Sequence, residues 1–358
     1  MLDDSLLDDP SRLLDADTGG LLRAAARAGA QVRATAEVAH ELGVERFFSD
    51  RPRALVLVAT PGVGPAVAAL VTALLGPRCP VPVVVSDDVP AWVGALDVVL
   101  AHTEDPGDVR LAESVDRVAR RGARVLLTAE PEGPVAAAAA RHALLVPPRV
   151  PVPRGLGFAR AFSAWLVALK ALGLLDVDVQ AVADELDREA ERCHPQHESF
   201  VNPAKTLALR VADRTPLLWG LDDLATAVAA HGAGMLAAHA GVVSDVAGYP
   251  QASTRSALHR RAVGGTSGAD IFADPDEEQD GLVRVLLLAV RRDPQAEFTR
   301  RVAMETLSGA DVLEPAEEVG GGEAVCAALL ALRFELAALY LGLAAGTLGG
   351  PGLYAPAV

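Results

Sequence analysis

Short apolar runs alternate with longer Ala-rich stretches through the first half of the chain. Five runs rich in Val, Leu and Ala have the length of strands, the fifth being the weakest: residues 54–59, 81–86, 97–102, 123–128 and 143–146. Continuous apolar runs of this kind are typical of strands buried on both faces of a sheet. The segments between them predict helices over residues 66–75, 109–121 and 135–142. This alternation predicts right-handed crossovers and therefore a parallel sheet.

The flanking segments set the expected domain division. One long helix is expected over residues 20–42, and the Pro-rich stretch 147–153 ends the first unit because proline breaks helices and favours extended chain. The next helices are expected over residues 157–175, over residues 177–192, and from Asn202-Pro203, where Asn caps and Pro opens a helix.

The second half repeats the theme without a strict sequence repeat. Strands are expected at residues 216–219 and 282–290, and a helix at 324–345. The chain has 358 residues, which suits two domains. We therefore predict an α/β protein divided into residues 1–155 (the N-terminal helix and a first domain) and residues 156–358 (linker helices and a second domain).

Charge and composition restrict the partners and the compartment. The formal net charge is −15 and no Lys/Arg-rich run offsets it, so nucleic acid and anionic membrane are not expected partners. Three widely spaced cysteines favour a reducing compartment. No signal peptide is visible in the acidic N-terminal segment, and Arg333 and Glu335 interrupt the longest apolar stretch, which therefore predicts a buried helix rather than a membrane span. These features predict a cytoplasmic protein.

A Gly-containing loop follows the first expected strand. Residues 60–66 read T-P-G-V-G-P-A, and glycines at such a turn let backbone N–H groups approach a phosphate at a helix N-terminus. Gly62 and Gly64 are therefore candidate ligand-binding residues. The loop has neither the G-x-G-x-x-G pattern nor a P-loop lysine. The sequence therefore favours the alternative, in which these residues form only a tight turn.

Residues 193–198 (C-H-P-Q-H-E) gather three possible metal ligands, Cys193, His194 and His197. Zinc prefers such ligands, but no second cluster completes a set of four. We expect a polar connecting loop, with no bound metal and no cofactor.

Two other segments carry weaker patterns. The acidic run 274–280 lacks the spacing of a calcium loop and predicts a solvated surface loop. Residues 265–269 (G-T-S-G-A) end in Ala and follow no clear strand, so they give Ser/His/Asp catalysis no support.

Several short phrases point together to a known family. They are residues 29–33 (GAQVR), 118–128 (VARRGARVLLT), 152–153 (VP) with 158–161 (FARA), 183–187 (ADELD), 201–208 (VNPAKTLA), 215–220 (TPLLWG) and the closing stretch 328–346. In order and spacing they resemble the bifunctional phosphoglucose/phosphomannose isomerases, and more closely the TobH-like proteins of high-GC bacteria. The resemblance covers almost the whole chain. It implies two sugar isomerase (SIS) domains, each a parallel β-sheet flanked by helices, and a homodimer with sugar-phosphate sites near the interface.

The chain departs from this family at the phosphate loop. The family reads S-Y-S-G-N-T after the third strand, and the matching residues 101–106 read A-H-T-E-D-P. Thr103 keeps a hydroxyl and is the candidate ligand-binding residue that this match implies. Glu104 replaces the Gly, and Pro106 has no N–H to donate. Glu104, Asp105 and Asp108 would place negative charge where a phosphate should bind, which predicts weakened phosphate binding.

The family's catalytic groups are also missing. The phrase E-N-x-K that holds the general base matches residues 237–241 (A-A-H-A-G), and no Glu occurs between Glu198 and Glu277. The ring-opening phrase P-E-x-N-H-N matches residues 250–255 (P-Q-A-S-T-R), and residues 346–358 contain no Lys. Arg160, which faces the reacting sugar in the family, is retained and is a candidate for binding and catalysis.

Substitute residues for the lost roles would be His239, Asp245 or His259. A lone His on an Ala-rich helix is more often a packed or surface residue than a base.

Three functions remain open from the sequence. The first is a binding or regulatory protein on a catalytically degenerate isomerase scaffold, which takes a sugar phosphate or a related small metabolite or pairs with an enzyme. The second is an active phosphosugar aldose–ketose isomerase that uses substitute residues. The third is a structural dimerisation partner. The lost base favours the first, since fold alone does not determine function. A homodimer is also expected from the apolar content and the Ala/Leu-rich residues 20–42.

Overall fold

The computed structural model describes residues 2–140, 143–266 and 283–348. These residues form two compact units. The central unit is Arg27–Asp187, and the terminal unit combines Met1–Ala26 with Arg188–Val358.

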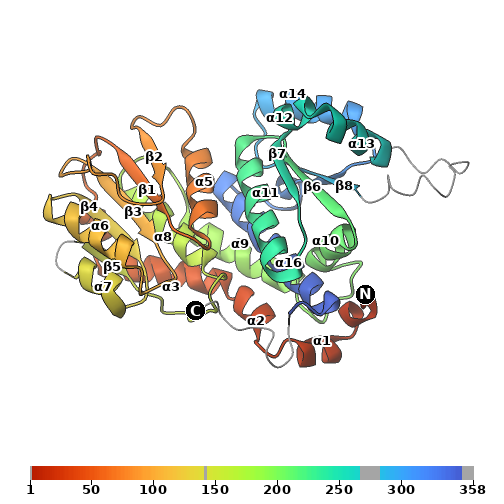
Figure 1. The fold of residues 1–358 in the computed structure, drawn as a ribbon, viewed down its shortest axis with the longest axis horizontal. Helices are drawn as coiled ribbons and strands as arrows, with labels where there is room; N and C mark the ends of the chain where they lie inside the picture. Colours follow the sequence, from red (N-terminus) through yellow and green to blue (C-terminus); the bar gives the residue numbers. More distant parts are fainter. Residues whose placement is uncertain (1, 141–142, 267–282, 349–358) are drawn as a thin grey trace, which may run out of the picture. The chain divides into compact units, whose positions relative to one another are not determined.

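The central unit contains one parallel sheet (Figure 1). Its strands are β1 (Leu55–Ala59), β2 (Val83–Ser86), β3 (Val98–His102), β4 (Arg124–Thr128) and β5 (Ala143–Val146). Its helices are α3 (Ala28–Glu41), α4 (Val44–Phe47), α5 (Gly64–Leu75), α6 (Val109–Arg120), α7 (Gly133–Ala139), α8 (Phe158–Ala171) and the larger part of α9 (Val179–Arg192). The strand order is β2-β1-β3-β4-β5, and every neighbouring pair is parallel.

Helices cover both faces of this sheet. The helices α6 and α7 pack together over the face that carries Val56, Val99 and Val125. The helix α8 packs against α3, α5 and β4. Because both faces are covered, the strands are continuous apolar runs rather than alternating ones.

The terminal unit contains a second parallel sheet, in the order β7-β6-β8-β9. Its strands are β6 (Thr215–Gly220), β7 (Asp245–Gly248), β8 (Val283–Leu288) and β9 (Asp311–Leu313). Its helices are η1 (Asp4–Asp8), α1 (Pro10–Ala16), α2 (Leu21–Ala25), α10 (Pro203–Val211), α11 (Asp223–Met235), η2 (Leu236–Ala240), α12 (Tyr249–Thr254), α13 (Ser256–Thr266), α14 (Pro294–Thr306), α15 (Pro315–Glu318) and α16 (Glu323–Ala345). The α/β fold with two parallel sheets flanked by helices is confirmed.

The expected helix over residues 20–42 is wrong as a single element. The chain forms α2 and α3, separated by a turn at Ala26 and Arg27 where the division between the two units falls. The helix α2 packs on α16 and α3 packs on α8. The two halves of the expected helix therefore have different packing partners, and tertiary contacts override the helical propensity of the joining residues.

The expected domain boundary at residues 155/156 remains a prediction, and the compact units divide the chain differently. The helix α8 belongs to the central unit, and the boundary falls inside α9. The acidic run 274–280 lies outside the described residues, and the segment 265–269 is described only in part.

Two phrases that carry the family resemblance pack together in the central unit. A Cβ added at Gly29 on α3 would lie 2.6 Å from the carbonyl oxygen of Ala183 on α9, so glycine permits this close approach. Arg33 pairs with the carboxylates of Asp184 (2.8 Å) and Asp187 (2.5 Å). The phrases at residues 29–33 and 183–187 therefore have a packing role.

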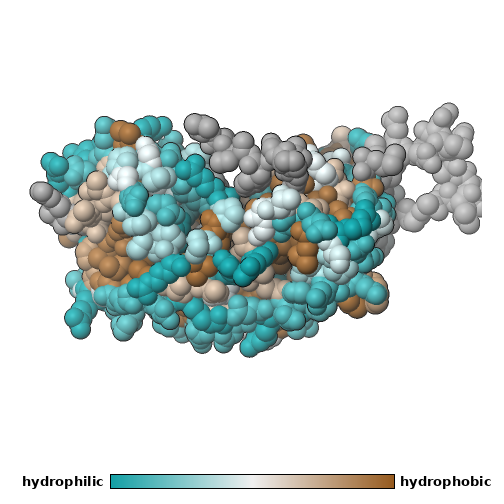
Figure 2. Space-filling view, turned by 90° about the horizontal axis from the view of Figure 1, so that it is seen from below, coloured by the Kyte–Doolittle hydropathy of each residue, from teal (hydrophilic) through white to brown (hydrophobic). Residues whose placement is uncertain are grey.

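The long apolar helix α16 is a core element of the terminal unit. It is the one helix among the described residues that is long and apolar enough to cross a membrane, and its most apolar stretch is entirely buried. Arg333 and Glu335, which interrupt the stretch, are both buried and both paired, Arg333 with Glu189 and Glu335 with His231. Figure 2 shows hydrophilic and hydrophobic residues interspersed on one face of the chain.

Candidate functional site

The strand order of the central unit reverses beside β1, because the chain proceeds from β1 to β2 on one side and then to β3 on the other. Parallel sheets bind ligands in the crevice outside the carboxyl ends of their strands at such a point. Thr60, Thr103 and Ala129 follow the ends of β1, β3 and β4 at this edge. The topology therefore directs attention to these loops.

A pocket of about 480 Å³ lies at this edge. Four charged side chains line it, Glu104, Glu130, Arg154 and Arg160. The remaining wall is mostly proline and valine: Pro106, Pro131, Pro148, Val150, Pro151 and Val152. The Pro-rich segment that follows β5 therefore shapes the pocket as well as ending the sheet.

Arg160 is the buried cation of this pocket. It lies in the first turn of α8 with 5% of its surface exposed, and its Nη1 is 3.5 Å from Oε1 of Glu130. Its Nε and Nη1 have no hydrogen-bond partner among the described residues. Burial lowers the pKa of Arg160, while the neighbouring Glu130 and Glu104 oppose that shift. Because buried donors are normally satisfied, an unpartnered Nε and a loosely paired Nη1 on a residue that lines a pocket indicate a place for an oxygen-bearing ligand.

Glu104 carries a carboxylate that the backbone holds in place. Its Oε2 accepts a hydrogen bond from Gly155 N at 2.9 Å, and its Oε1 accepts one from Gly157 N at 3.2 Å. A Cβ at Gly157 would lie 2.5 Å from Oε1, and one at Gly62 would lie 3.2 Å from Oε2. Burial raises the pKa of Glu104, and the two N–H groups and Arg160 oppose the shift. The carboxylate thus occupies a small cradle lined by glycine backbone.

His102 is the last residue of β3 and is almost fully buried. Its Nδ1 lies 2.8 Å from the Thr128 hydroxyl, and its backbone carbonyl accepts a hydrogen bond from Thr60 Oγ1 at 2.5 Å. Its Nε2 has no partner among the described residues. Burial lowers the pKa of His102 to about 3, and the charge of Arg160 lowers it further in the same direction, so the ring is neutral at physiological pH.

The structure places the predicted ligand-binding residues unevenly. Gly62 has a φ of +100°, which glycine adopts readily, and lies next to the Glu104 carboxylate. Gly64 opens α5, where a Cβ would lie 3.3 Å from the carbonyl carbon of Ala59, so its role is close packing. The Thr103 hydroxyl is buried and bonded to the backbone of Asp105, accepting from its N–H at 3.0 Å. Gly62 therefore lies near Arg160's pocket, whereas Thr103 stabilises a local turn.

The candidate substitute residues Asp245 and His259 surround the buried Trp219 in the terminal unit. Asp245 begins β7, so it lies at the amino end of that strand, away from the edge at which parallel sheets bind ligands. Its carboxylate pairs with Arg255 at 2.6 Å and accepts a hydrogen bond from Trp219 Nε1 at 2.9 Å. The His259 ring stacks on Trp219 with centroids 5.8 Å apart. These contacts favour a structural role for both.

His239 lies apart from that cluster, on η2. It is 4% exposed, and neither ring nitrogen has a hydrogen-bond partner among the described residues. Burial and the nearby His231 lower the pKa of His239. A buried neutral histidine without an orienting partner lacks the arrangement expected of a general base.

At the corresponding switch point of the terminal unit, the loop after β6 carries a capping aspartate. Asp222 follows β6, and its Oδ1 accepts the N–H of Ala225 at 2.8 Å, which caps α11. Its Oδ2 accepts the N–H groups of Val290 at 2.9 Å and Arg291 at 3.0 Å, just beyond β8. The Asp222 carboxylate therefore links the residues just beyond β8 to the N-terminus of α11, the helix that follows β6.

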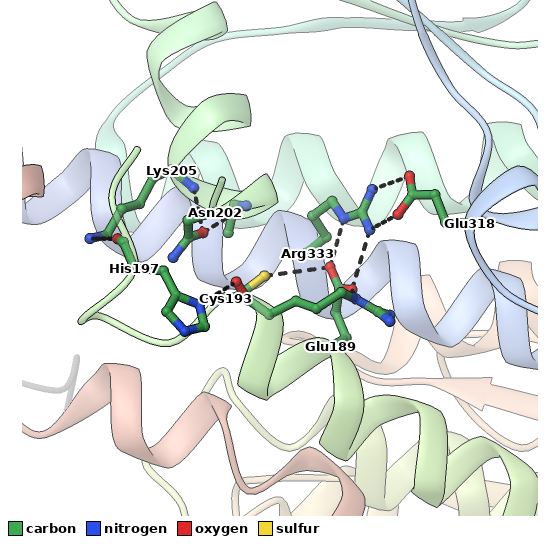
Figure 3. Close-up of polar contacts among 9 residues, drawn as sticks. Glu189, Cys193, His197, Asn202, Lys205, Glu318 and Arg333 are labelled. Atoms are coloured by element: carbon green, nitrogen blue, oxygen red, sulfur yellow. Dashed lines mark hydrogen bonds and ion pairs between the residues drawn. The ribbon is translucent and has the colours of Figure 1, made fainter. Parts of the chain in front are cut away.

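The segment 193–198 is organised around a buried lysine (Figure 3). The Nζ of Lys205 donates to the carbonyl oxygens of Leu7 (2.5 Å), Pro195 (2.8 Å) and His197 (2.6 Å). The Cys193 carbonyl accepts a hydrogen bond from the Tyr340 hydroxyl at 2.6 Å. The described residues contain no group of three or more His, Cys, Asp or Glu that could hold a metal. The absence of a metal stays a prediction, and the loop's visible role is to supply carbonyls to Lys205.

A second buried polar network joins α9, α15 and α16 (Figure 3). Arg333 donates to Glu189 at 2.6 and 3.2 Å and to Glu318 at 2.8 and 2.5 Å. The Cys193 thiol lies 3.4 Å from Glu189, and burial together with this carboxylate raises the pKa of the thiol well above its ordinary value. Cys193 is therefore a protonated, unreactive thiol.

Sequence reasoning missed His102, Glu130 and the glycines at 155 and 157 as parts of this site. His102 and Glu130 stand at or just after strand ends, which is a readable signal. The two glycines follow the Pro-rich stretch and begin no strand, so only the folded chain brings them to Glu104.

One family model matches the second part of the chain, and several solved structures share its fold. Residues 200–347 match the family model described as the bacterial phospho-glucose isomerase C-terminal SIS domain. A sequence comparison with curated proteins finds no match. A candidate phosphosugar isomerase from Bacillus subtilis is 11% identical with a TM-score of 0.62, and the match covers 88% of this chain and 95% of that one.

Two further solved structures have a similar fold. Tagatose-6-phosphate ketose/aldose isomerase from Escherichia coli is 11% identical with a TM-score of 0.58, covering 92% of this chain and 94% of that one. The C-terminal domain of glucosamine-fructose-6-phosphate aminotransferase from Francisella tularensis is 10% identical with a TM-score of 0.59 and the same coverage. These likenesses show a phosphosugar isomerase-like fold. The finer resemblance to bifunctional isomerases or TobH-like proteins stays a prediction.

Proposed function

We propose that this protein binds a sugar phosphate or a related polar metabolite in the pocket of the central unit and does not isomerise it. The observation that carries the proposal is Arg160, which lines a pocket of about 480 Å³. Its guanidinium is buried, its Nε has no hydrogen-bond partner among the described residues, and its Nη1 has only a 3.5 Å ion pair with Glu130. A hydroxyl or oxyanion of a sugar derivative would satisfy those donors.

The charged groups around the pocket support binding more than proton transfer. Aldose–ketose isomerisation needs a general base within hydrogen-bond reach of a carbon-bound proton. Glu104 accepts two backbone N–H bonds, which commit its oxygens, and Glu130 is paired with Arg160. Asp245 is tied to Arg255 and Trp219 in the terminal unit. None of these three carboxylates is therefore free to act as the general base that the active-isomerase alternative requires.

A ligand screen tests the binding proposal. Thermal unfolding of the purified protein is followed with glucose 6-phosphate, mannose 6-phosphate, fructose 6-phosphate and unphosphorylated glucose. A ligand at about 100 times its Kd should add about 2.7 kcal/mol of stability. Arg160→Ala should abolish the shift. Arg110→Ala removes an exposed charge on α6 outside the pocket and should leave the shift unchanged.

A coupled isomerase assay on the same protein tests the absence of catalysis. We expect no turnover with glucose 6-phosphate or mannose 6-phosphate. Turnover above about 1 s⁻¹, the low end for ordinary enzymes, that is lost in Arg160→Ala would replace the binding proposal with an isomerase.

We also propose that the chain forms a homodimer, on the strength of its exposed apolar side chains. Phe200 and Val243 are 79% and 78% exposed on the terminal unit. Light scattering at micromolar concentration should give twice the 37.0 kDa chain mass, and a monomer would contradict the proposal.

A further inference from the structure

We propose that the N-terminal turn of α8 is an oxyanion-binding site that the chain fills with its own Glu104 carboxylate, so that a phosphate- or sulfate-like group binds there only when this carboxylate is displaced. The inference deepens the proposed function and rests on it only in placing the ligand in the same pocket.

The first support is the donor geometry around Glu104. The N–H groups of Gly155 and Gly157 reach separate oxygens of one carboxylate, at 2.9 and 3.2 Å. Gly157 is also the N-cap residue of the fourteen-residue helix α8. Converging N–H groups at a helix N-terminus favour negative charge, because the helix dipole adds to the hydrogen bonds. The same donors would accept any tetrahedral oxyanion of similar size.

The second support is independent of the helix end. Arg160 lines the same pocket, is 5% exposed, and leaves Nε without a hydrogen-bond partner among the described residues, while Nη1 has only a 3.5 Å ion pair with Glu130. The site therefore has unused donor capacity although two carboxylates are already present. Glu104 satisfies the backbone donors and leaves Arg160 Nε without a partner.

The third support is space. The Glu104 carboxylate lies against glycines on two sides, since a Cβ at Gly157 would be 2.5 Å from Oε1 and one at Gly62 would be 3.2 Å from Oε2. No side chain at these positions separates the carboxylate from the backbone. A pocket of about 480 Å³ adjoins it and can receive either the displaced side chain or the remainder of a ligand.

Charge explains why the carboxylate acts as a competitor. The charged residues that line the pocket are two arginines and two glutamates, so their formal charges (+2 and −2) cancel. Removing Glu104 leaves a formal charge of +1 beside two vacated N–H donors. When Glu104 is present, an incoming dianion must approach a carboxylate that already accepts the N–H groups of Gly155 and Gly157. The intact site consequently favours ligands of low negative charge over phosphate dianions.

The experiment titrates sulfate into the full chain by calorimetry at pH 7.5. The proteins are the wild type, Glu104→Ala, Glu104→Gln, and Glu132→Gln as a control that removes an exposed carboxylate outside the pocket lining. Glu104→Ala should bind sulfate at least about ten-fold more tightly than the wild type, the ratio that 1.4 kcal/mol represents. Glu104→Gln, which removes the charge and keeps most of the volume, should fall between them. Glu132→Gln should match the wild type.

Two further measurements locate the gain. Arg160→Ala in the Glu104→Ala background should cancel the gain in affinity. Glycine-selective ¹⁵N labelling should show the Gly155 and Gly157 amide signals shifting with sulfate in Glu104→Ala and not in the wild type. If Glu104→Ala fails to fold, as judged by circular dichroism, Glu104→Gln carries the same test.

Equal sulfate affinity in wild type and folded Glu104 variants overturns the inference, as does a gain that survives loss of Arg160. The two proposals fail separately. Hexose phosphate binding that is unchanged in Glu104→Ala keeps the proposed function and removes this inference. Sulfate binding by Glu104→Ala, with no metabolite binding by the wild type, keeps this inference and removes the proposed function.

Discussion

The two sheets of this protein share one strand order at their switch points, yet they use an acidic residue there in different ways. In the terminal unit, Asp222 accepts three backbone N–H groups and serves as a helix cap. In the central unit, Glu104 accepts two, and the neighbouring Arg160 keeps unsatisfied donors beside a pocket. Both carboxylates accept structural N–H groups, but only Glu104 lies beside a pocket and a buried donor that has no partner among the described residues, which marks a place for a ligand.

Two buried cations in the core of the terminal unit are also satisfied by structural partners. Arg333 binds Glu189 and Glu318 through all its donor nitrogens, and Lys205 binds three carbonyls. These satisfied groups stabilise the packing of helices, and they leave no donor nitrogen for a ligand to bind. The comparison predicts large stability effects in the terminal unit and binding effects in the central unit.

The largest expected effect is on the Arg333 network. Arg333→Met should lower the free energy of unfolding by about 3 kcal/mol, because the buried Glu189 loses its buried partner and keeps only the partly exposed Arg192. Urea denaturation measures this change. Arg120→Met, which removes an exposed pair with Asp116, is the matched control and should cost less than about 1 kcal/mol. Equal losses in Arg333→Met and Arg120→Met would show that the buried network stabilises the fold no more than an exposed ion pair does.

The second largest loss of stability is expected for a substitution at Asp222. Asp222→Ala removes the cap of α11 and two further acceptor contacts beyond β8, so we expect a loss of about 2–3 kcal/mol in urea denaturation. Asp108→Ala, which caps α6 through the single N–H of Leu111, should cost about 1 kcal/mol. Glu104→Ala should cost less than Asp222→Ala. The reverse order of the two costs would contradict the distinction between the two switch points.

The buried His102 predicts a specific pH dependence. Its folded pKa of about 3 lies below the ordinary value of 6.5, so between these values the unfolded chain binds a proton that the folded chain does not. Stability is therefore fully present above pH 6.5 and is lost as pH falls toward 3. From pH 7.5 to 5 this residue should cost about 2 kcal/mol.

His102→Asn removes the titrating ring and should lose less stability than the wild type over the same interval. Urea titrations at pH 7.5 and pH 5 compare the two proteins. Parallel losses would assign the acid sensitivity to other groups.

The smallest expected effect is on ligand affinity through the rim of the pocket. Glu130 is 45% exposed at its side chain and pairs with Arg160 over 3.5 Å, so Glu130→Gln should raise metabolite affinity only a few-fold by releasing Arg160. Calorimetry with the metabolite that the ligand screen identifies measures this ratio. A strong loss of affinity in Glu130→Gln would mean that this carboxylate contacts the ligand directly.

The local sequence determined most of the central sheet. Each of its five strands was predictable within two residues, because strands covered by helices on both faces are continuous apolar runs. The strands β7 and β9 were not predicted. They are short edge strands, and β7 reads D-V-A-G, which carries little β-branched or aromatic signal. The helix expected at residues 20–42 was divided by packing partners that local propensity cannot indicate.

The sequence likewise singled out Arg160 and Gly62, and it identified Glu104 as a charge placed where the family's phosphate loop has glycine. It could not show what Glu104 does, because its two backbone partners lie 51 and 53 residues further along the chain. Nor could it show that Asp245 belongs to a structural ion pair. Residue types and strand patterns follow from local sequence, whereas the satisfaction of a buried polar group depends on which distant backbone reaches it, and only the tertiary structure decides that.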